Sequence, residues 1–299
     1  MLAEVREAVG LFERRFVFNA MLPLAVFGVA TITAVLAFND SLVPFLRWID
    51  SRSGIAQGIA ALLAFATCWM AAGVLASQWR SLVRLFEGYP LVAAWIRLPF
   101  FGDRPFPGTK HHENRRYQID QRDADEFYMS YCSLEFEVLP TRFGNILLAA
   151  ERYPYERYGV DPILFWPRLF PSLPDHFRDD YGVYVMAYEF PLVVGALSVL
   201  CGTVVAWASI WAHASYLWFA LILTSSWTVA YFFYLSACSA AAEWGEQLRT
   251  AFDLYRTNLL LLYPDLDSIP DERTKFDALS NMIRLGEPGK APSLTGDQT

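Results

Sequence analysis

The chain has 299 residues, of which 55% are hydrophobic, 16% aromatic and 18% charged, and its net charge is −7. The hydrophobic share exceeds that of soluble globular proteins, yet the charged share requires that a large part of the chain contact water. The acidic balance and the lack of a Lys/Arg-rich run or a recognition motif exclude nucleic acid as an expected partner. The four cysteines occur singly, without CxxC or zinc spacing, so we expect no metal and no other cofactor.

The first 79 residues contain two apolar stretches of membrane-spanning length. Residues 1–16 carry mixed charge and predict a short N-terminal amphipathic segment. The stretch 17–38 follows acidic residues and is too long for the core of a signal peptide, which predicts a retained span. The stretch 53–79 carries no formal charge and predicts a second span, so that 17–79 form a first transmembrane hairpin.

The connection between these spans, 39–53, is predicted to be short and polar, with Pro44, Phe45 and Trp48 at a membrane interface. At the start of the second span, Gly54 and Gly58 form a GxxxG pair, a spacing that permits close helix contact. The pair has two interpretations, a dimerisation face or ordinary packing against the first span. We favour ordinary packing, because an isolated motif of this kind is a weak signal.

Residues 80–188 form a polar insert with thirteen Lys/Arg and fifteen Asp/Glu residues. We predict a helix from Arg80 that ends at Gly88 and a loop over 98–108. The sequence His111-His112-Glu113 raises the hypothesis of a metal site on a loop. We do not favour it, because adjacent loop histidines face different directions and no third ligand is suitably spaced.

Charged and aromatic residues alternate densely between positions 139 and 168. Thr141 can cap a helix that Pro154 would end. In a structural interpretation, the charged side chains pair with one another at the membrane surface. In a functional one, which we favour less because no glycine-rich phosphate loop is present, they bind an anionic headgroup, nucleotide or partner carboxylate. This candidate anion or partner surface comprises Arg142, Asn145, Glu151, Arg157, Asp161, Trp166 and Arg168.

The run PTRFGNILLAAERYPYERYGVDPILFWPRL, residues 140–169, resembles a segment of an uncharacterised family of multi-spanning bacterial inner-membrane proteins. The motifs PTRxGN, YGxD and WPRL carry the resemblance, and the sequence at 245–256 is also similar to a helix of that family. The resemblance implies a bacterial inner-membrane protein and implies no activity.

The second half of the chain contains a long uncharged stretch. No Asp, Glu, Lys or Arg occurs between Glu189 and Glu243, and this length holds two spans. We predict a second transmembrane hairpin over 189–238, with spans at 190–211 and from 216 to about 237. Small residues recur along the first of these spans and predict close packing between helices.

Two polar features of this hairpin are candidate pore or membrane-depth groups. Glu189 lies at the mouth of the third span, where an ionisable residue is a functional candidate, but we favour simple contact with interfacial water. Thr224, Ser225 and Thr228 form a polar patch within the fourth span. Their hydroxyl groups either line a water path or bond to carbonyls one turn back.

The segment 239–285 is predicted to be a helical cytoplasmic extension with an apolar stripe. We expect the fourth span to continue as one helix to about Tyr263, where Pro264 stops it, and a shorter helix over 271–285. The stripe needs a partner, either the insert or a second copy of the chain. This candidate helix interface comprises Trp244, Leu248, Phe252, Tyr255 and Leu259. Residues 286–299, rich in Gly, Pro and polar residues, predict a disordered tail.

The distribution of positive charge predicts the orientation. Of the 24 Lys and Arg residues, three precede the first span, thirteen lie in the insert and six follow the fourth span. Only Arg47 and Arg52 lie on the other side, which places both termini and the insert in the cytoplasm of a multi-pass inner-membrane protein.

Together these patterns predict an all-α integral membrane protein. Four transmembrane helices form two hairpins, with a helical cytoplasmic insert and a long C-terminal helix that continues from the last span. The expected partners are the lipid bilayer and either further copies of the chain or another membrane protein.

Three functions remain open at this point. We rank first a non-enzymatic scaffold or signalling partner that presents a cytoplasmic helical domain. A homo-oligomeric channel or pore ranks second, since small residues in the spans permit assembly. A membrane-surface enzyme acting on lipid or another anionic ligand ranks third, because no nucleophile, base and orienting carboxylate are recognisable as a set.

Overall fold

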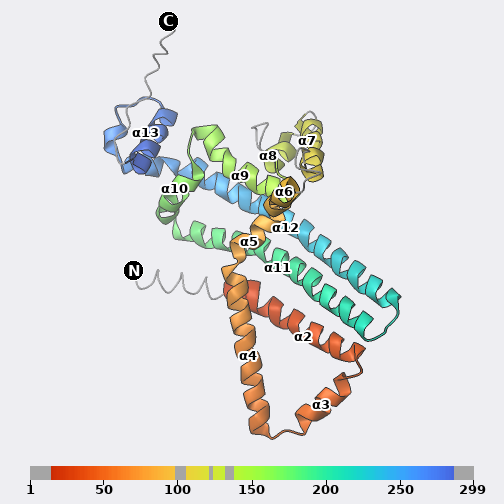
Figure 1. Cartoon of the computed structure of the whole chain (residues 1–299). Helices are drawn as coiled ribbons and strands as arrows, with labels where there is room; N and C mark the ends of the chain where they lie inside the picture. The colour runs from red at the N-terminus through yellow and green to blue at the C-terminus, as the bar shows by residue number, and fades with distance from the viewer. Residues whose placement is uncertain (1–14, 98–105, 121–123, 132–137, 286–299) are drawn as a thin grey trace. The chain divides into compact units, whose positions relative to one another are not determined.

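The computed structural model describes residues 15–97, 106–120, 124–131 and 138–285, and every regular element in these ranges is helical (Figure 1). The predictions for residues 1–14, for the loop at 98–105, for Cys132 and for the tail at 286–299 lie outside the described residues. Four helices are long and apolar enough to cross a membrane, in agreement with the predicted spans. The chain divides into two compact units, unit 1 (Met1–Phe86 and Val185–Ala240) and unit 2 (Glu87–Tyr184 and Ala241–Thr299).

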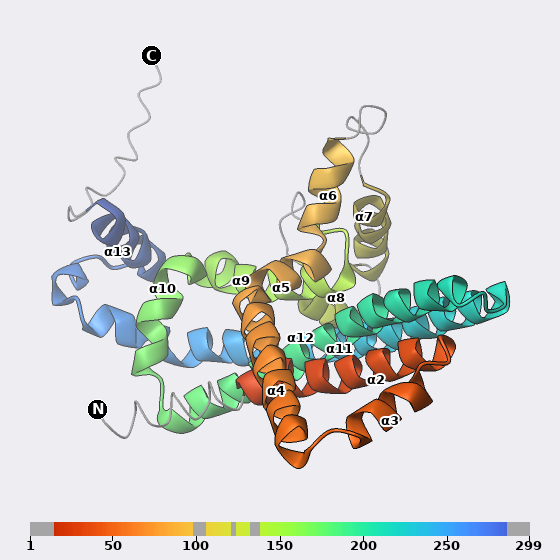
Figure 2. The same ribbon diagram turned by 60° about the horizontal axis from the view of Figure 1, so that its bottom comes forward.

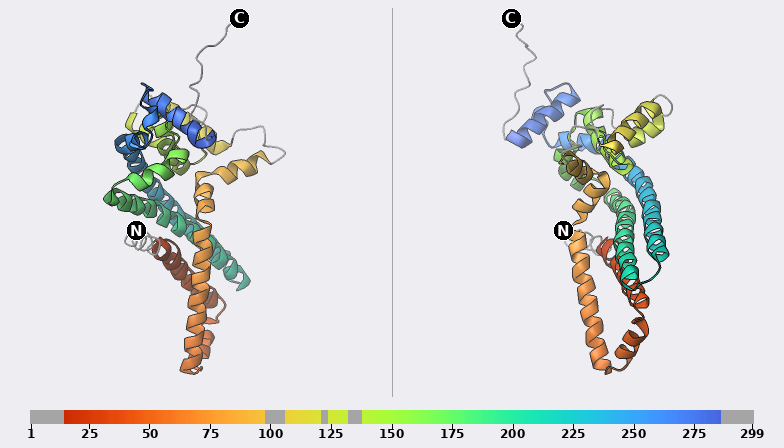
Figure 3. Two further views of the ribbon diagram at one scale, coloured as in Figure 1. Left: turned by 90° about the vertical axis from the view of Figure 1, so that its left-hand side faces the viewer. Right: turned by 45° about the vertical axis from the view of Figure 1, so that its right-hand side comes forward.

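Unit 1 contains the apolar helices. Its elements are the π-helix η1 (Val17–Met21), α2 (Leu22–Phe38), α3 (Leu42–Asp50), α4 (Gly54–Ser77) and most of α5 (Trp79–Glu87), with the apolar parts of α11 (Asp175–Trp211) and α12 (Tyr216–Leu261). α4 contacts η1, and from there α2 and α4 diverge toward α3, which connects their far ends (Figures 1 and 3). The large apolar side chains along α4 are exposed, as expected for a helix surrounded by lipid.

Two expectations about the first pair of spans differ from the structure. The connection at 39–53 contains the helix α3, whose exposed apolar side chains include Phe45 and Trp48. Apolar residues at helical spacing account for this helix in a segment that we expected to be an irregular connection. A methyl group added at Gly54 or Gly58 would meet no described atom within 4 Å, so the favoured packing of this pair against the first span is not found.

The apolar parts of α11 and α12 pack through small residues. A side chain added at Gly202 would overlap Ser226, and one added at Gly195 would lie 3.5 Å from the carbonyl oxygen of Ala230. Ala206 and Ser209 are buried on the same helix. α2 lies along these two helices (Figure 2). Residues of all three helices line an apolar cavity of about 320 Å³. The predicted close packing of small residues is therefore present in unit 1.

Unit 2 is built from shorter helices around the polar end of α12. These helices are α6 (Tyr89–Ile96), α7 (Pro107–Asp120), α8 (Ala124–Ser130), α9 (Arg142–Tyr158), α10 (Pro162–Leu169) and α13 (Glu272–Leu285), with the 3-10 turns η2 (Phe170–Ser172) and η3 (Pro264–Leu266). α12 runs without a break to Leu261 and α13 follows, which confirms the long helix and the shorter helix predicted near the C-terminus.

Of three local expectations for the insert, the structure confirms one and contradicts two. Gly88 has a φ of 92° and ends α5, as predicted from its sequence. His111 and His112 lie on the helix α7 rather than on a loop. α9 continues through Pro154 and ends at Gly159, whose φ is 73°. A proline removes only one backbone donor, and the surrounding packing of unit 2 holds the helix together past it.

Candidate functional site

The carboxylate of Glu189 is buried in unit 1 and is held by two side chains from elsewhere in the chain. Its side chain is only 1% exposed and accepts hydrogen bonds from Nε and Nη2 of Arg15, the first over 2.6 Å. Nδ2 of Asn19 donates to Oε2 of Glu189 over 3.1 Å. The two guanidinium bonds form a bidentate pair, a strong and directional geometry for arginine and carboxylate.

The local course of the chain explains how these donors converge. Arg15 and Asn19 are four residues apart, so they lie on one face of the helical segment that leads into α2. Within η1 the N–H of Leu22 bonds to the carbonyl of Val17, five residues back, which is the hydrogen bond of a π-helix. Such wider turns are frequent at functional sites, and this one contains the buried Asn19.

A cavity of about 400 Å³ lies beside the Arg15–Glu189 pair, within unit 1. Its lining combines polar and apolar side chains, with two guanidinium groups and one carboxylate. The polar groups in the lining are Arg15, Asn19, Ser77, Trp79, Arg80 and Glu189. The side chain of Arg15 is 43% exposed, so its N–H donors that do not bond to Glu189 remain accessible.

The chemistry that this arrangement supports is the binding of an anion. Arg15 and Arg80 carry planar, permanently charged donors, whereas Glu189 already accepts bonds from Arg15 and Asn19. Across the ranges that the structure describes, no group of three or more His, Cys, Asp or Glu side chains is placed to hold a metal ion. We refer to the cavity lined by Arg15, Asn19, Ser77, Trp79, Arg80 and Glu189 as the Arg15/Arg80 cavity.

The other predicted membrane-depth groups have partners within their own helix. Oγ1 of Thr224 donates to the carbonyl of Ala220 over 2.8 Å, and Oγ1 of Thr228 donates to the carbonyl of Thr224 over 2.7 Å. Oγ of Ser225 donates to the carbonyl of Ile222 over 3.0 Å. These hydroxyl groups therefore bond to carbonyls one turn back, which is the second of the two arrangements considered above.

The predicted anion or partner surface separates into buried and exposed residues. Asn145 is buried, and Trp166 packs at a tilt against Phe252, with ring centroids 5.9 Å apart. Asp161 caps the first turn of α10 and pairs with Arg284. The remaining residues of the set are exposed, and they are Arg142, Glu151, Arg157 and Arg168. Arg168 donates to the carbonyl of Leu164 on its own helix over 2.6 Å.

The predicted helix interface lies in the core of unit 2. Trp244, Leu248, Phe252 and Leu259 are buried, and Tyr255 packs edge to face with Phe177, with ring centroids 5.8 Å apart. The apolar stripe packs against the chain's own insert, which is one of the two partners considered for it. A methyl group added at Gly245 would lie 3.0 Å from Cβ of Ala150, which shows how closely α9 packs on α12.

Sequence reasoning missed the burial of Arg249, which lies outside the apolar stripe of α12. Arg249 is 2% exposed, and its guanidinium carbon lies 4.2 Å from the centroid of the Tyr128 ring. It donates to the carbonyl of Tyr128 over 2.8 Å and to Oε1 of Glu246 over 2.6 Å. Cation–π contact and these bonds stabilise a charge that would otherwise be costly to bury.

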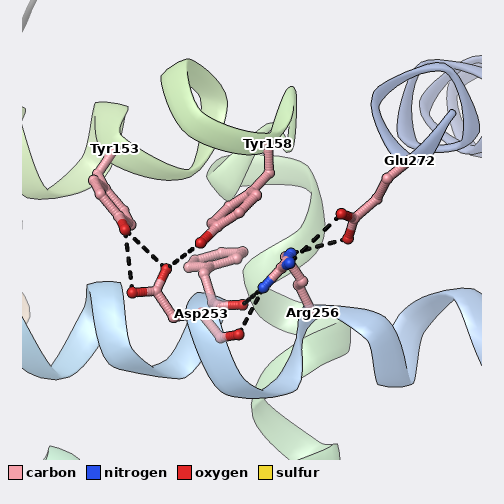
Figure 4. A network of polar contacts seen from close by, with 6 residues as sticks. Tyr153, Tyr158, Asp253, Arg256 and Glu272 are labelled. Carbon is pink, nitrogen blue, oxygen red and sulfur yellow. Dashed lines mark hydrogen bonds and ion pairs between the residues drawn. The ribbon is translucent and has the colours of Figure 1, made fainter.

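A polar network next to Arg249 joins three helices of unit 2 (Figure 4). Asp253 accepts hydrogen bonds from the hydroxyl groups of Tyr153 over 2.9 Å and Tyr158 over 2.8 Å. Arg256 lies over the Tyr158 ring at 3.8 Å and donates to Glu272 of α13 over 2.9 Å. Burial and the adjacent Asp253 carboxylate raise the pKa of Tyr153, so this hydroxyl group remains a donor.

The PTRxGN motif has a structural role at the start of α9. Oγ1 of Thr141 accepts a bond from the N–H of Gly144 over 3.0 Å and donates to the carbonyl of Glu87 over 3.0 Å. A methyl group at Gly144 would lie 2.7 Å from that same carbonyl oxygen, so a side chain there would collide with the backbone. Asn145 bonds to the N–H and carbonyl of Leu139 over 2.8 and 2.7 Å.

The YGxD motif closes α9 and opens α10. The N–H of Gly159 donates to the carbonyl of Tyr155 over 2.9 Å, and the N–H of Val160 donates to the carbonyl of Pro154 over 3.2 Å. A glycine suits this position because its φ is positive. The side chain of Asp161 then accepts a bond from the N–H of Ile163 over 3.0 Å.

No protein-family model, curated protein or solved structure matches the chain.

Proposed function

We propose that the chain is a multi-pass protein of the bacterial inner membrane that presents unit 2 in the cytoplasm as a non-enzymatic scaffold or signalling partner. One contrast carries this proposal. The apolar side chains of α4 are exposed, whereas the apolar stripe of α12 is buried inside unit 2. Exposed apolar helices of this length are stable in a bilayer, and a helical unit with its own core is stable in water.

The finer arrangement is part of the same proposal. The four apolar helices are arranged as two transmembrane hairpins, and both termini and the 80–188 insert are cytoplasmic. The support for this orientation is the position of Arg47 and Arg52, which are the only two of 24 positive residues on the opposite side. The resemblance of the 140–169 segment supports a place in the same bacterial membrane family.

The scaffold has more support than a channel. A water path would need polar groups that face an open lumen, yet Thr224, Ser225 and Thr228 donate to carbonyls of their own helix. Glu189 is buried against Arg15 and Asn19 rather than free to contact ions. We propose that the chain acts through a protein partner, either further copies or another membrane protein.

Labelling single cysteines tests the orientation. The four native cysteines are replaced by Ser, and one cysteine is introduced either at Ser51 or at Arg157, an exposed residue of α9. A membrane-impermeant maleimide added to intact spheroplasts is expected to label Ser51→Cys at once and Arg157→Cys only after permeabilisation. The reverse pattern would overturn the orientation, and labelling of both from outside would overturn the spans.

Mass and flux measurements separate the scaffold from the channel. The scaffold proposal predicts a monomer, a dimer or a complex with a second protein when the full chain is extracted in detergent, and no ion flux in liposomes. A closed ring of identical subunits, with a flux that changes in Thr224→Val but not in Thr257→Val, would favour the channel instead. Thr257 is an exposed threonine of unit 2 and serves as the matched control.

A further inference from the structure

We infer that the Arg15/Arg80 cavity binds an anionic phospholipid, with the phosphate of the headgroup at the two guanidinium groups and an acyl chain along α4. This inference rests on the proposed placement of unit 1 in a bilayer, because only there is the lipid present at high concentration. It does not depend on what unit 2 binds.

The polar end of the cavity matches a phosphate group. Arg15 is oriented by its bidentate bond to Glu189, and its remaining donors are accessible on a side chain that is 43% exposed. Arg80 lines the same cavity and is itself exposed. Two arginines and one glutamate line the cavity, which leaves an excess of positive charge there and favours an anion.

The apolar end continues from the polar one along α4. A second cavity, of about 370 Å³, is lined by Phe16, Trp69, Gly73, Ala76 and Ser77. Three of these residues, Phe16, Ala76 and Ser77, also line the first cavity, so the two spaces adjoin. A methyl group added at Gly73 would meet no described atom within 4 Å, so the groove has open space at this glycine.

The combination of the two ends identifies the class of ligand. A soluble anion would use the guanidinium groups and leave the groove beside Gly73 empty, whereas a neutral lipid would fill the groove and leave the excess charge unmatched. Basic pockets between membrane helices are typical sites for anionic headgroups. Trp79 lines the polar end, and aromatic residues are common near the headgroup region.

Native mass spectrometry of the full chain tests the inference. The protein is purified in detergent and mixed with phosphatidylglycerol or phosphatidylcholine that carries the same acyl chains. We expect one retained phosphatidylglycerol per chain and a several-fold lower occupancy by phosphatidylcholine. Equal occupancy of the two lipids would overturn the role of the guanidinium groups.

Two pairs of variants locate the bound lipid. Arg80→Gln is expected to weaken phosphatidylglycerol binding about fivefold, the effect of one cation near a membrane surface. Arg84→Gln removes the same charge from an exposed residue of α5 outside the cavity and should leave binding unchanged. Gly73→Leu fills the groove and should abolish lipid retention, whereas Gly58→Leu on the same helix, also in open space, should retain it.

The outcomes also separate this inference from the proposed function. If Arg80→Gln behaves like Arg84→Gln, or Gly73→Leu like Gly58→Leu, the lipid does not occupy this cavity. If glycerol phosphate without acyl chains displaces phosphatidylglycerol as well as the intact lipid does, the cavity binds a soluble anion and the lipid inference is wrong. An inverted topology or a conducting ring would defeat the proposed function and leave the lipid count unaltered.

Discussion

Nε of Arg15 lies 2.6 Å from Oε2 of Glu189, although the two residues are 174 positions apart in the sequence. This pair joins the segment that leads into the first apolar helix to the third one, and it orients the guanidinium group beside the cavity. The side chain of Glu189 is almost fully buried, whereas that of Arg15 is 43% exposed.

The Arg15–Glu189 pair should contribute to the stability of unit 1. In Glu189→Gln the guanidinium group loses its anionic partner, which for a buried pair lowers the free energy of unfolding by about 3 kcal/mol. We expect a loss no larger than this value, because Arg15 is partly exposed and solvent can compensate its charge. Unfolding in detergent monitored by tryptophan fluorescence measures this change.

A double-mutant cycle is the control for that experiment. Arg15→Gln combined with Glu189→Gln should cost less than the sum of the two single substitutions, because each single variant leaves one charged group without its partner. Additive effects would mean that the two side chains do not interact in the folded protein.

The close contact between Gly202 of α11 and Ser226 of α12 should tolerate no larger side chain. Gly202→Leu is expected to lower the free energy of unfolding by about 1–3 kcal/mol, because extra atoms at a packed contact force the helices apart. Thermal denaturation in detergent provides the measurement. Gly58→Leu adds the same atoms in open space and should leave the midpoint unchanged; an equal loss in both variants would contradict the packing described here.

The Asp253 network should stabilise unit 2 through its hydrogen bonds (Figure 4). Tyr158→Phe removes one bond to Asp253 but keeps the ring over Arg256, and we expect a loss of about 1 kcal/mol in the free energy of unfolding. Tyr155→Phe removes a hydroxyl group from an exposed residue of the same helix and should have no effect. Chemical denaturation followed by circular dichroism compares the two variants, and identical curves would refute the role of the network.

The buried His112 should make the stability of unit 2 depend on pH. Burial, followed by the nearby charges of His111, Arg115 and Arg142, lowers the pKa of His112 from 6.5 to about 4. Above pH 6.5 both folded and unfolded chains hold a neutral ring, so the stabilisation is fully present there. As the pH falls from 6.5 to about 4, only the unfolded chain gains a proton, which lowers the free energy of unfolding by up to about 3 kcal/mol.

Replacing His112 removes that dependence. His112→Gln should unfold with a flatter pH profile between 4 and 6.5, whereas His176→Gln, at an exposed histidine of the same unit that is not among the charges near His112, should keep the slope of the wild type. Denaturation midpoints measured across this pH range provide the comparison. A slope that is unchanged in His112→Gln would show that another group titrates.

Several elements were predictable because they follow from local sequence. The four apolar helices follow from length and composition, and the continuity of α12 to Leu261 follows from apolar residues at helical spacing without an interrupting proline. The end of α5 follows from Gly88, since a glycine adopts a positive φ without steric cost. These features depend on neighbours a few residues away, which any window of the sequence contains.

The candidate site was only partly predictable. Glu189 is conspicuous as the last charge before an apolar stretch, and Arg15 and Asn19, four residues apart at the start of the first span, are a signal of one polar face. Their mutual contact was not predictable, because ion pairing acts across whatever surfaces the folded chain brings together. The same holds for Trp79 and Arg80, which lie at the start of α5 and line the same cavity.

Tertiary packing alone decided which polar residues of unit 2 are buried. Arg249 lies on the charged face of an amphipathic helix and would be exposed if only the apolar stripe were covered, yet Tyr128 and Tyr153 cover this face as well. Pro154 likewise continues a helix that its chemistry alone would interrupt. Local propensities amount to fractions of a kcal/mol per residue, so long-range packing outweighs them where side chains distant in sequence fill the same space.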